Sequence, residues 1–575
     1  LQVSAPVGGA FDANGDIICL ACHDKLGPAW SQSAHADPTV ADELYKAQAA
    51  NLREFPAGTR VWQAACLNCH DTHTVQGSRR LLREGTDAAS VDLSTPKHGG
   101  TAAIEETCYQ CHTTAAESVL TSVVNVPDIK TDFLLPRRMP ITNADQQSGG
   151  ETHDILDADF SETQQNLGQG NLLNRHAECS DCHNPHRLMR NQLFNGTGTN
   201  SEATHAHGTN HSNIASGALR GAWGVEPIYG SESFQSLPLS YLVKKGDGGI
   251  GAGTAVDSSH VTREYQICLK CHSDYAYLDD NVYPTGSRPD LGSSGGGTPS
   301  GTNALTQFTN QAKEFQAPFS HRGEVTAANT GAGTAYTTNN HRSWHPVMDS
   351  TGRNAAVRGN MNPNAFVAPW NSAIGTQTMY CTDCHGSATA NATAVPSGSN
   401  PWGPHGSTKD FILKGDWDRN TGSGQADDLY FKCHAFNTYP QDGGARTGFF
   451  DPNSRGDLHS YHQNKIGTMR CSWCHVAVPH GWKNKALLVN LNDVGPEAGL
   501  SPGGEEVCTG SGGFGPTNGG CSQNNGYTNG PYYLNAFLKI VNFATSGQWQ
   551  ENDCGSASGA IGRDWMRDTA CDNPN

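Results

Sequence analysis

The segment Cys179-Ser-Asp-Cys182-His183-Asn-Pro-His186 contains the pattern that decides how this chain folds. Two cysteines three positions apart are followed at once by a histidine, which is the attachment sequence of a covalently bound heme. Two thiols at this spacing can each form a thioether to one vinyl group of a single porphyrin, and the imidazole of the next residue then lies under the iron. The segment therefore predicts a porphyrin, a large apolar plate, at this point of the interior.

The same five-residue motif occurs seven times in the 575 residues and uses 14 of the 19 cysteines. A zinc ribbon needs two cysteine pairs for each metal and gives no reason for a histidine after every pair. A redox-active dithiol normally occurs once in a chain. Seven copies therefore favour seven heme c groups. The motif cysteines are Cys19, Cys22, Cys66, Cys69, Cys108, Cys111, Cys179, Cys182, Cys268, Cys271, Cys381, Cys384, Cys471 and Cys474, and the histidines that follow them are His23, His70, His112, His183, His272, His385 and His475.

An eighth heme is predicted at Tyr430-Phe-Lys-Cys433-His434, where tyrosine replaces the first cysteine. Like the motif at Cys268–His272, this segment has lysine before its second cysteine position and tyrosine five residues after its histidine. We interpret it as a heme held through one thioether; the alternative is a vestigial motif with a free thiol. Cysteine parity supports the heme, because the four cysteines that remain can close two disulfides, most simply Cys508–Cys521 and Cys554–Cys571.

Composition limits the other possibilities. Hydrophobic residues make up 36% of the chain and glycine contributes 66 residues, so aliphatic side chains cannot fill a large interior. The net charge of −17 argues against a nucleic-acid partner. No apolar run is long enough for a transmembrane helix, and no signal peptide is present at Leu1, which suggests the mature form of an exported protein. Covalent heme attachment takes place on the export side of the membrane in bacteria and archaea. We therefore expect an extracellular or outer-surface location, and a periplasmic one less.

A heme that only carries electrons is best six-coordinate, because an occupied sixth position excludes substrates. The 25 histidines suffice for two ligands at each of eight irons, whereas the seven methionines recur at no fixed offset from the motifs. The sequence therefore predicts bis-histidine ligation, which gives lower potentials than His/Met ligation. The histidines expected as second ligands are His35, His73, His98, His186, His345, His405, His459 and His480. The reserves are His153, His176, His260, His321, His341 and His462, whereas His205, His207 and His211 are expected in a solvated loop or an adventitious metal site.

Two of these histidines lie three residues after the histidine of a motif: His73 follows His70, and His186 follows His183. The two axial ligands of one iron are on opposite faces of the porphyrin, and an extended residue spans at most about 3.3–3.6 Å. Three residues cannot easily pass round the edge of the ring. We therefore expect each of the two to ligate a neighbouring heme, which would hold two hemes close together.

The spacing of the motifs divides the chain into four regions. Residues 1–130 hold three motifs, residues 131–360 hold two that are separated by long Gly/Ser/Thr loops, residues 361–486 hold three, and residues 487–575 hold none. Helical periodicity is weak, with Thr39–Arg53 the best candidate, and short turns are expected around each motif. The predicted fold is mostly irregular, coil-rich backbone wrapped round a heme stack, with few short helices and minimal sheet.

The segment His176–His186, Ala222-Trp-Gly and the segment Tyr265–His272 resemble the outer-surface multiheme c-type cytochromes of metal-reducing bacteria, which include doubled C-x-x-C-H proteins and cytochromes that polymerise into conductive filaments. The resemblance covers roughly Cys19 to His480 and is loose between motifs. It implies bis-histidine hemes, little regular secondary structure and, in some members, a second ligand from the next subunit. The chain departs from the family pattern at Tyr430 and in its long tail.

The favoured function is extracellular electron transfer along the hemes, with other redox proteins or metal oxides as partners and with self-association into filaments. A monomeric shuttle and a component of an outer-membrane complex are alternatives within this class. The alternative from another class is an octaheme oxidoreductase acting on nitrogen or sulfur oxyanions. Every motif ends in histidine, which disfavours an open iron, and Cys433 with Tyr430 beside it is the one place suited to a special heme. No catalytic residue is predicted.

Overall fold

The computed structural model describes at least part of all eight motifs. The described residues are 19, 23, 27–71, 81–83, 103–139, 151–153, 155, 177–196, 213–230, 237–275, 311–315, 345–348, 363–372, 378–398, 400–416, 425–439, 450–451, 456–457, 459–460, 475 and 480. The predictions that fall outside these ranges concern Cys22, Cys471, Cys474, His73, His98, His176, His205, His207, His211, His321, His341, His462 and the tail with Cys508, Cys521, Cys554 and Cys571.

The helices of the described ranges are short, and they confirm the coil-rich fold. The longest, α5, has seven residues (Ala103–Tyr109). The others are α2 (Gly27–Ser31), α3 (Ala47–Leu52), α4 (Val61–Ala64), α6 (Lys130–Phe133), α7 (Cys179–Cys182), α8 (Tyr265–Cys268), α9 (Gln311–Glu314) and α11 (Cys381–Cys384). Helices this short are marginal in isolation, so their neighbours must stabilise them. No helix in the described part of the chain combines the length and the apolarity needed to cross a membrane.

The motifs share one local conformation. In seven of them the backbone N–H of the histidine donates to the carbonyl four residues earlier, over distances of 2.8 to 3.0 Å. These histidines are His23, His70, His112, His183, His272, His385 and His434. Because side chains three residues apart lie on the same face of a helical turn, the turn brings both cysteines of a motif to one side. In α7 and α11 an aspartate caps the turn: Asp181 accepts the N–H of Glu178 at 2.9 Å, and Asp383 accepts that of Tyr380 at 2.7 Å.

The strands form small sheets that join distant parts of the chain. One sheet has the order β1 (Arg137–Met139), β2 (Glu151–His153), β5 (Gly406–Ser407), with β1 parallel and β5 antiparallel to β2. Its register pairs Thr152 with Gly406, and the His153 N–H donates to the His405 carbonyl at 3.2 Å. Two antiparallel hairpins consist of β3 (Gly224–Ile228) with β4 (Ser240–Lys244), and of β6 (Phe450–Asp451) with β7 (Gly456–Asp457).

The helix predicted over Thr39–Arg53 is wrong for its first half. Only Ala47–Leu52 is helical, as α3. Upstream of it, Leu44 forms a β-bridge with Arg60, and Tyr45 forms one with Leu120. These tertiary pairings supply the backbone hydrogen bonds that a longer helix would have made, which is a case of packing overriding a weak propensity.

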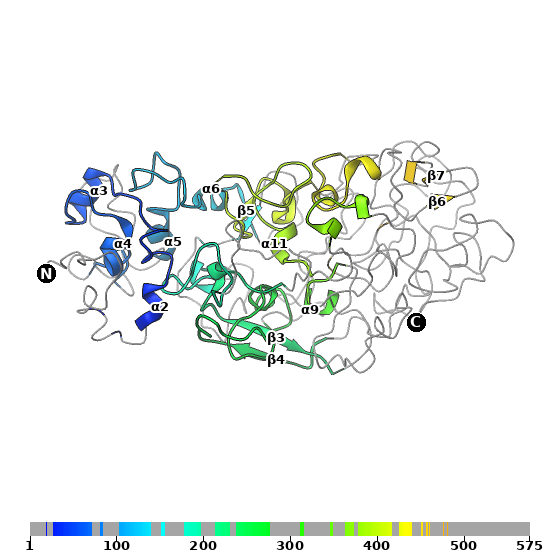
Figure 1. Ribbon diagram of the computed structural model, residues 1–575, viewed down its shortest axis with the longest axis horizontal. Helices are drawn as coiled ribbons and strands as arrows, with labels where there is room; N and C mark the ends of the chain where they lie inside the picture. The colour runs from blue at the N-terminus through cyan, green and yellow to red at the C-terminus, as the bar shows by residue number, and fades with distance from the viewer. Residues whose placement is uncertain are drawn as a thin grey trace.

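The hydrophobic core is divided into small clusters that contain motif cysteines at their edges. One cluster gathers Tyr45, Val61 and Leu120 with Cys111 packed against it, and another gathers Trp223, Tyr265 and Leu269 with Cys271 and Cys381. Figure 1 shows α2–α5 at one end of the long axis and β6 and β7 towards the other, with β5 beside α6 between them. The small clusters therefore pack against motif cysteines at several points along the chain.

Candidate heme-binding sites

Six pairs of histidines lie at nearly the same separation. Each pair joins one motif histidine to a histidine from elsewhere in the chain. The distances between ring centroids are 6.3 Å for His112 and His35, 6.2 Å for His70 and His186, 6.1 Å for His272 and His153, 6.0 Å for His183 and His405, 6.1 Å for His385 and His480, and 6.1 Å for His475 and His459.

This separation fits a metal ion held between two imidazoles. Two metal–nitrogen bonds in line, plus the distance from each nitrogen to the centre of its ring, give a centroid separation of about 6.4 Å. The observed range of 6.0 to 6.3 Å is close to this value. The two imidazoles of each pair would hold one iron between them, and a porphyrin-bound iron accepts two such ligands. Among the described residues there is no group of three or more His, Cys, Asp or Glu that could hold a metal ion by themselves.

For six of the paired imidazoles the environment favours the neutral form, which is the form that ligates a metal. Burial is the largest cause in each case. It lowers the pKa of His112 and of His385 to about 4, helped by the neighbouring His35 and His480, and lowers the pKa of His405 to about 3. The pKa values of His35, His153 and His183 are lowered by the same burial.

Backbone carbonyls fix which ring nitrogen is left for the metal. The Nδ1–H groups of paired histidines donate to carbonyl oxygens over 2.6 to 3.1 Å. An Nδ1 that donates in this way leaves Nε2 as the ligating atom and fixes the plane of the ring. The donor and acceptor pairs are His35 and Pro185, His112 and Pro127, His153 and Pro404, His183 and Ala218, and His385 and Phe411.

The structure brings five of the eight histidines expected as second ligands opposite a motif histidine, namely His35, His186, His405, His459 and His480. His345, beside the buried residues Pro346–Met348, is not a member of the six pairs. Neither is His260, a reserve, whose ring lies 5.6 Å from that of Phe194.

His153 was expected only as a reserve second ligand, but in the structure its ring lies opposite that of His272. No signal in the sequence around His153 would have found it. The β2–β5 register positions this residue: it brings the segment of His153 beside the segment of His405, and these two histidines then belong to two different pairs.

His186 lies opposite the histidine of a different motif, as its position three residues after His183 led us to expect. Its ring is parallel to that of His70, with an interplanar angle of 7°, whereas His183 is opposite His405. The segment Asn184–Met189 therefore connects two candidate sites. It continues one motif and supplies a ligand position at another.

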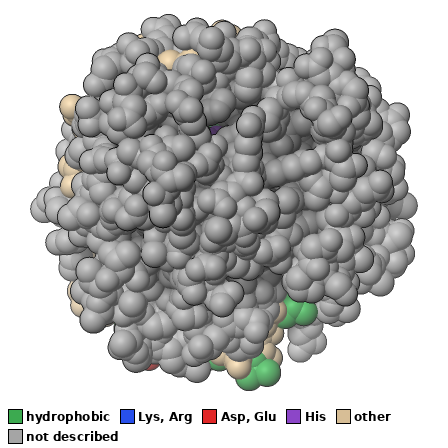
Figure 2. All heavy atoms as spheres, turned by 90° about the vertical axis from the view of Figure 1, so that its right-hand side faces the viewer, with side chains coloured by type: hydrophobic (Ala, Val, Ile, Leu, Met, Phe, Trp, Pro, Cys, Tyr) green, Lys and Arg blue, Asp and Glu red, His purple; other side chains and the backbone are tan. Residues whose placement is uncertain are grey.

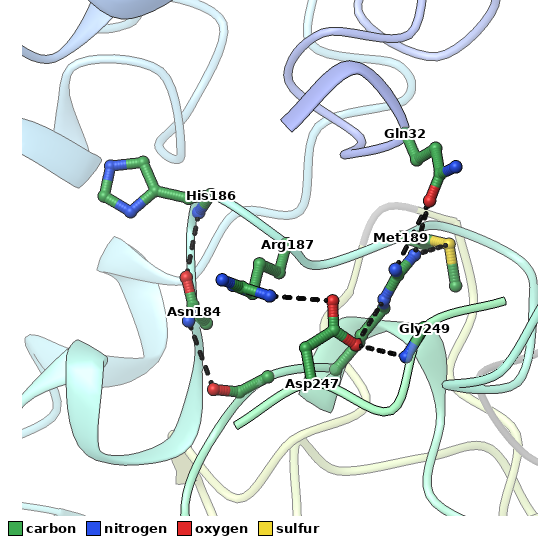
Figure 3. Close-up of polar contacts among 9 residues, drawn as sticks. Gln32, Asn184, His186, Arg187, Met189, Asp247 and Gly249 are labelled. Carbon is green, nitrogen blue, oxygen red and sulfur yellow. Dashed lines mark hydrogen bonds and ion pairs between the residues drawn. The ribbon is translucent and has the colours of Figure 1, made fainter. Parts of the chain in front are cut away.

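Figure 3 shows how the segment around His186 is held in place. The Asn184 side chain accepts the His186 N–H at 3.2 Å. Beside it, the buried Asp247 carboxylate accepts bonds from Arg187 at 3.0 Å and from Arg220 at 2.9 Å. Burial by itself would raise the pKa of Asp247, but the bonds from Arg220, Gly249 and Arg187 outweigh it and hold the pKa below its usual value. Asp247 thus fixes the chain that presents His186.

Thiol contacts place the motifs in a row that follows the sequence. We number the motifs 1 to 8 by their histidines, in the order His23, His70, His112, His183, His272, His385, His434 and His475. Cys108 of motif 3 is hydrogen bonded to Cys179 of motif 4, and Cys268 of motif 5 to Cys381 of motif 6. Electrostatic interactions between thiols join the remaining neighbours from motif 2 to motif 7, through Cys69 and Cys108, Cys182 and Cys268, and Cys384 and Cys433.

Motif 7 keeps the local fold of the other motifs although tyrosine replaces its first cysteine. The His434 N–H donates to the Tyr430 carbonyl at 2.8 Å, the bond that a cysteine carbonyl accepts elsewhere. A β-bridge joins His434 to Phe366, and the ring Nδ1 of His434 is 3.2 Å from the Tyr439 hydroxyl. Burial raises the pKa of the Cys433 thiol, which is near Cys384 of motif 6. Motif 7 therefore has the same backbone turn as the other motifs, with a buried thiol at its second cysteine position.

Comparison with known proteins gives one match. Residues 18–92, which contain motifs 1 and 2, match the family model described as cytochrome c554 and c-prime. No curated protein and no solved structure matches the chain. Taken with the attachment motifs and the histidine pairs, this match supports a multiheme c-type cytochrome with a heme-based role in electron transfer.

Proposed function

We propose that this chain is an extracellular electron conduit with eight heme c groups, arranged in the order of their motifs. The six histidine pairs at 6.0 to 6.3 Å carry the proposal, because each provides both axial ligands for one iron. Bound heme supplies a one-electron Fe(II)/Fe(III) couple of low potential when both ligands are histidine. Backbone carbonyls orient five of the paired imidazoles, and burial keeps water from these rings and favours their neutral form.

The pairs favour a carrier over an oxidoreductase. A catalytic heme needs an open coordination position for its substrate, whereas an imidazole lies opposite each of six motif histidines. Motifs 1 and 7, with His23 and His434, are not among the six pairs, so an open iron would have to be sought there.

We expect carbon monoxide to leave the absorbance of the six hemes at the paired motifs unchanged in the reduced protein. Binding at more than two hemes for each chain would contradict the carrier assignment.

A second prediction concerns the number of attached hemes. The denatured protein should have the mass of the polypeptide plus eight hemes, since thioethers survive unfolding. The heme at Cys433 should be bound through a single thioether, and Cys433→Ser should lose that heme alone. Tyr430→Cys should add a second thioether there without changing the fold. Mass spectrometry of the intact chain and of its heme peptides measures all three, and seven hemes in the parent chain would show that motif 7 is vestigial.

We further propose that copies of the chain associate into filaments. In support, a group of apolar side chains on and beside β4 is exposed and offers a contact for a second copy. Figure 2 shows exposed hydrophobic side chains at the lower edge of one end of the molecule, at the height of β3 and β4 in Figure 1. The residues of this group are Leu237, Leu239, Leu242 and Val243. Cryo-electron micrographs of the purified protein should show filaments. Single particles at all concentrations would favour a monomeric shuttle.

A further inference from the structure

Buried charged side chains lie where successive motifs meet, and their sign differs from one meeting place to the next. Between motifs 4 and 5 the charge is Lys270, which is 1% exposed. This lysine lies within motif 5, between Cys268 and Cys271, and its Nζ donates to the Asp181 carbonyl of motif 4. Burial raises the pKa of Cys182 and lowers that of His183 in motif 4, and the Lys270 charge makes a smaller lowering contribution to both. One ammonium group therefore acts on both motifs.

One buried charge between motifs 5 and 6 is Glu264, which is 4% exposed. It precedes α8 of motif 5 and binds Thr382 of motif 6 with both oxygens, at 3.0 Å to the backbone N–H and 2.8 Å to the hydroxyl. An ionised carboxylate can accept hydrogen bonds with both of its oxygens, which is the arrangement of Glu264 here. The negative charge raises the pKa of Cys381, after the larger effects of Cys268 and of burial. Motif 5 thus lies between a buried cation and a buried anion.

A buried cation recurs at two other meeting places. Between motifs 2 and 3, the buried Arg53 donates to the Asn68 carbonyl at 2.7 Å and to the Gln110 side chain at 2.6 Å. Between motifs 6 and 7, the buried Lys432 donates to the carbonyls of Thr389 at 2.8 Å and Ala390 at 3.0 Å. Lys432 occupies in motif 7 the position that Lys270 occupies in motif 5. The arrangement around motif 5 therefore belongs to a wider pattern.

We propose that Lys270 and Glu264 set the reduction potential of the heme at motif 5 by opposing effects, and so hold it level with its neighbours. Reduction adds one negative charge to a heme, so a buried cation nearby raises its potential and a buried anion lowers it. Lys270 acts on motifs 4 and 5, and Glu264 acts on motifs 5 and 6. Level potentials allow electrons to pass along a row without a trap. The inference rests on the proposed function, because it requires heme at these motifs.

The other charged groups described near α8 bind within motif 5 or the segments beside it, and none of the bonds named here reaches another motif. Glu226 accepts bonds from Tyr265 at 3.1 Å and Gln266 at 2.5 Å, and burial raises its pKa to about 7. Lys244 donates to the Val256 carbonyl at 2.6 Å, and Arg263 to the Thr254 carbonyl at 2.7 Å. All variants contain these groups, so at one pH the groups contribute equally to the heme potentials of each variant and do not affect the difference between variants. Lys270 and Glu264 differ from them because each binds the backbone of a neighbouring motif.

The test is a redox titration of the full chain, with dithionite as electron donor and the heme absorbance recorded at each potential. Lys270→Gln should lower the potentials of two hemes, those of motifs 4 and 5. The part of the absorbance change that belongs to these two hemes should therefore appear at lower potential. Glu264→Gln should shift an equal fraction, from motifs 5 and 6, to higher potential. In the double variant the heme of motif 5 should return towards its original potential, leaving one heme lowered and one raised. Lys270→Arg keeps the charge and should titrate like the parent chain.

Lys130→Gln is the matched control, because Lys130 forms an exposed ion pair with Glu117 that solvent screens. Shifts in the same direction for Lys270→Gln and Glu264→Gln, or shifts no larger than that of the control, would overturn the inference. So would a Lys270→Arg variant that titrates like the Lys270→Gln variant, since Lys270 would then act through packing. If Lys270→Gln loses heme, Glu264→Gln decides the proposal by the direction of its shift. A heme count on the parent chain tests the proposed function separately.

Discussion

Replacing His186 with methionine should raise the potential of the heme at motif 2 and leave the heme of motif 4 unchanged. His186 lies opposite His70 in motif 2, although it is only three residues from His183 in motif 4. Histidine–methionine ligation gives a higher potential than bis-histidine ligation. One heme should therefore move out of the low-potential group in a spectroelectrochemical titration, which is the largest single-heme effect that we expect from any substitution in this chain.

Two double variants identify which heme has moved. If His70 and His186 ligate one iron, the double variant His70→Met/His186→Met changes one heme. The variant His183→Met/His186→Met should then change two. The opposite outcome, with two hemes changed by the first variant and one by the second, would place His183 and His186 on the same iron. Our explanation of how the chain spaces its hemes would then be wrong.

Asp247→Asn should destabilise the protein by about 3–5 kcal/mol, the range for breaking a buried ion pair by removing one partner. The Asp247 side chain is 3% exposed and that of Arg220, its nearest cationic partner, is 2% exposed. Without the carboxylate, Arg220 and Arg187 keep their charges and lose the anion that compensates them (Figure 3). Urea titration followed by the heme absorbance measures the effect. The free energy of unfolding of the Asp247→Asn variant should fall by several kcal/mol.

Asp416→Asn is the control for the Asp247 variant. Asp416 is half exposed and pairs with Lys409 at 2.5 Å, and exposed ion pairs of this kind contribute about 0–1 kcal/mol. A second readout separates the anchoring of His186 from general stability. The Asp247→Asn variant should show partial loss of the low-spin spectrum at motif 2 before global unfolding. Equal losses of stability in the two variants would show that Asp247 does not fix this segment.

The pH dependence follows from the lowered pKa of Asp247. Its contribution to stability is fully present above the pKa of an unfolded aspartate, about 3.9, and is lost as the pH falls through the lower folded value. The parent chain should therefore lose this contribution only below about pH 4. The Asp247→Asn variant lacks the titrating group, so the stability difference between the two chains should shrink as the solution is acidified.

The histidine pairs also explain how a chain with so little regular structure can hold a defined conformation. Most pairs join residues that are far apart in sequence, such as His183 with His405 and His385 with His480. A metal held by two such residues closes a long loop, and binding free energy then becomes folding free energy. The small clusters of apolar side chains order the described segments locally, and under the proposed function ligation would add the long-range order.

The attachment motifs, their helical turn and the coil-rich backbone were predictable from the sequence, because each depends on residues within one turn of each other. The Tyr430–His434 segment could be identified as a motif for the same reason. The second ligands could not be assigned in this way. A sixth ligand closes a loop of tens to hundreds of residues, and the packing of the intervening chain selects which histidine arrives.

His153 illustrates the difference. Nothing next to it in the sequence distinguishes it from His260, yet the β2–β5 register places it opposite His272, whereas His260 contacts Phe194. The alternation of Lys270 and Glu264 likewise became visible only when motifs 4, 5 and 6 were in contact. The sequence by itself determined where the eight motifs lie and which local turn each of them forms. The tertiary structure decided which histidines pair and which charges surround each motif, because both depend on contacts between segments that the sequence leaves far apart.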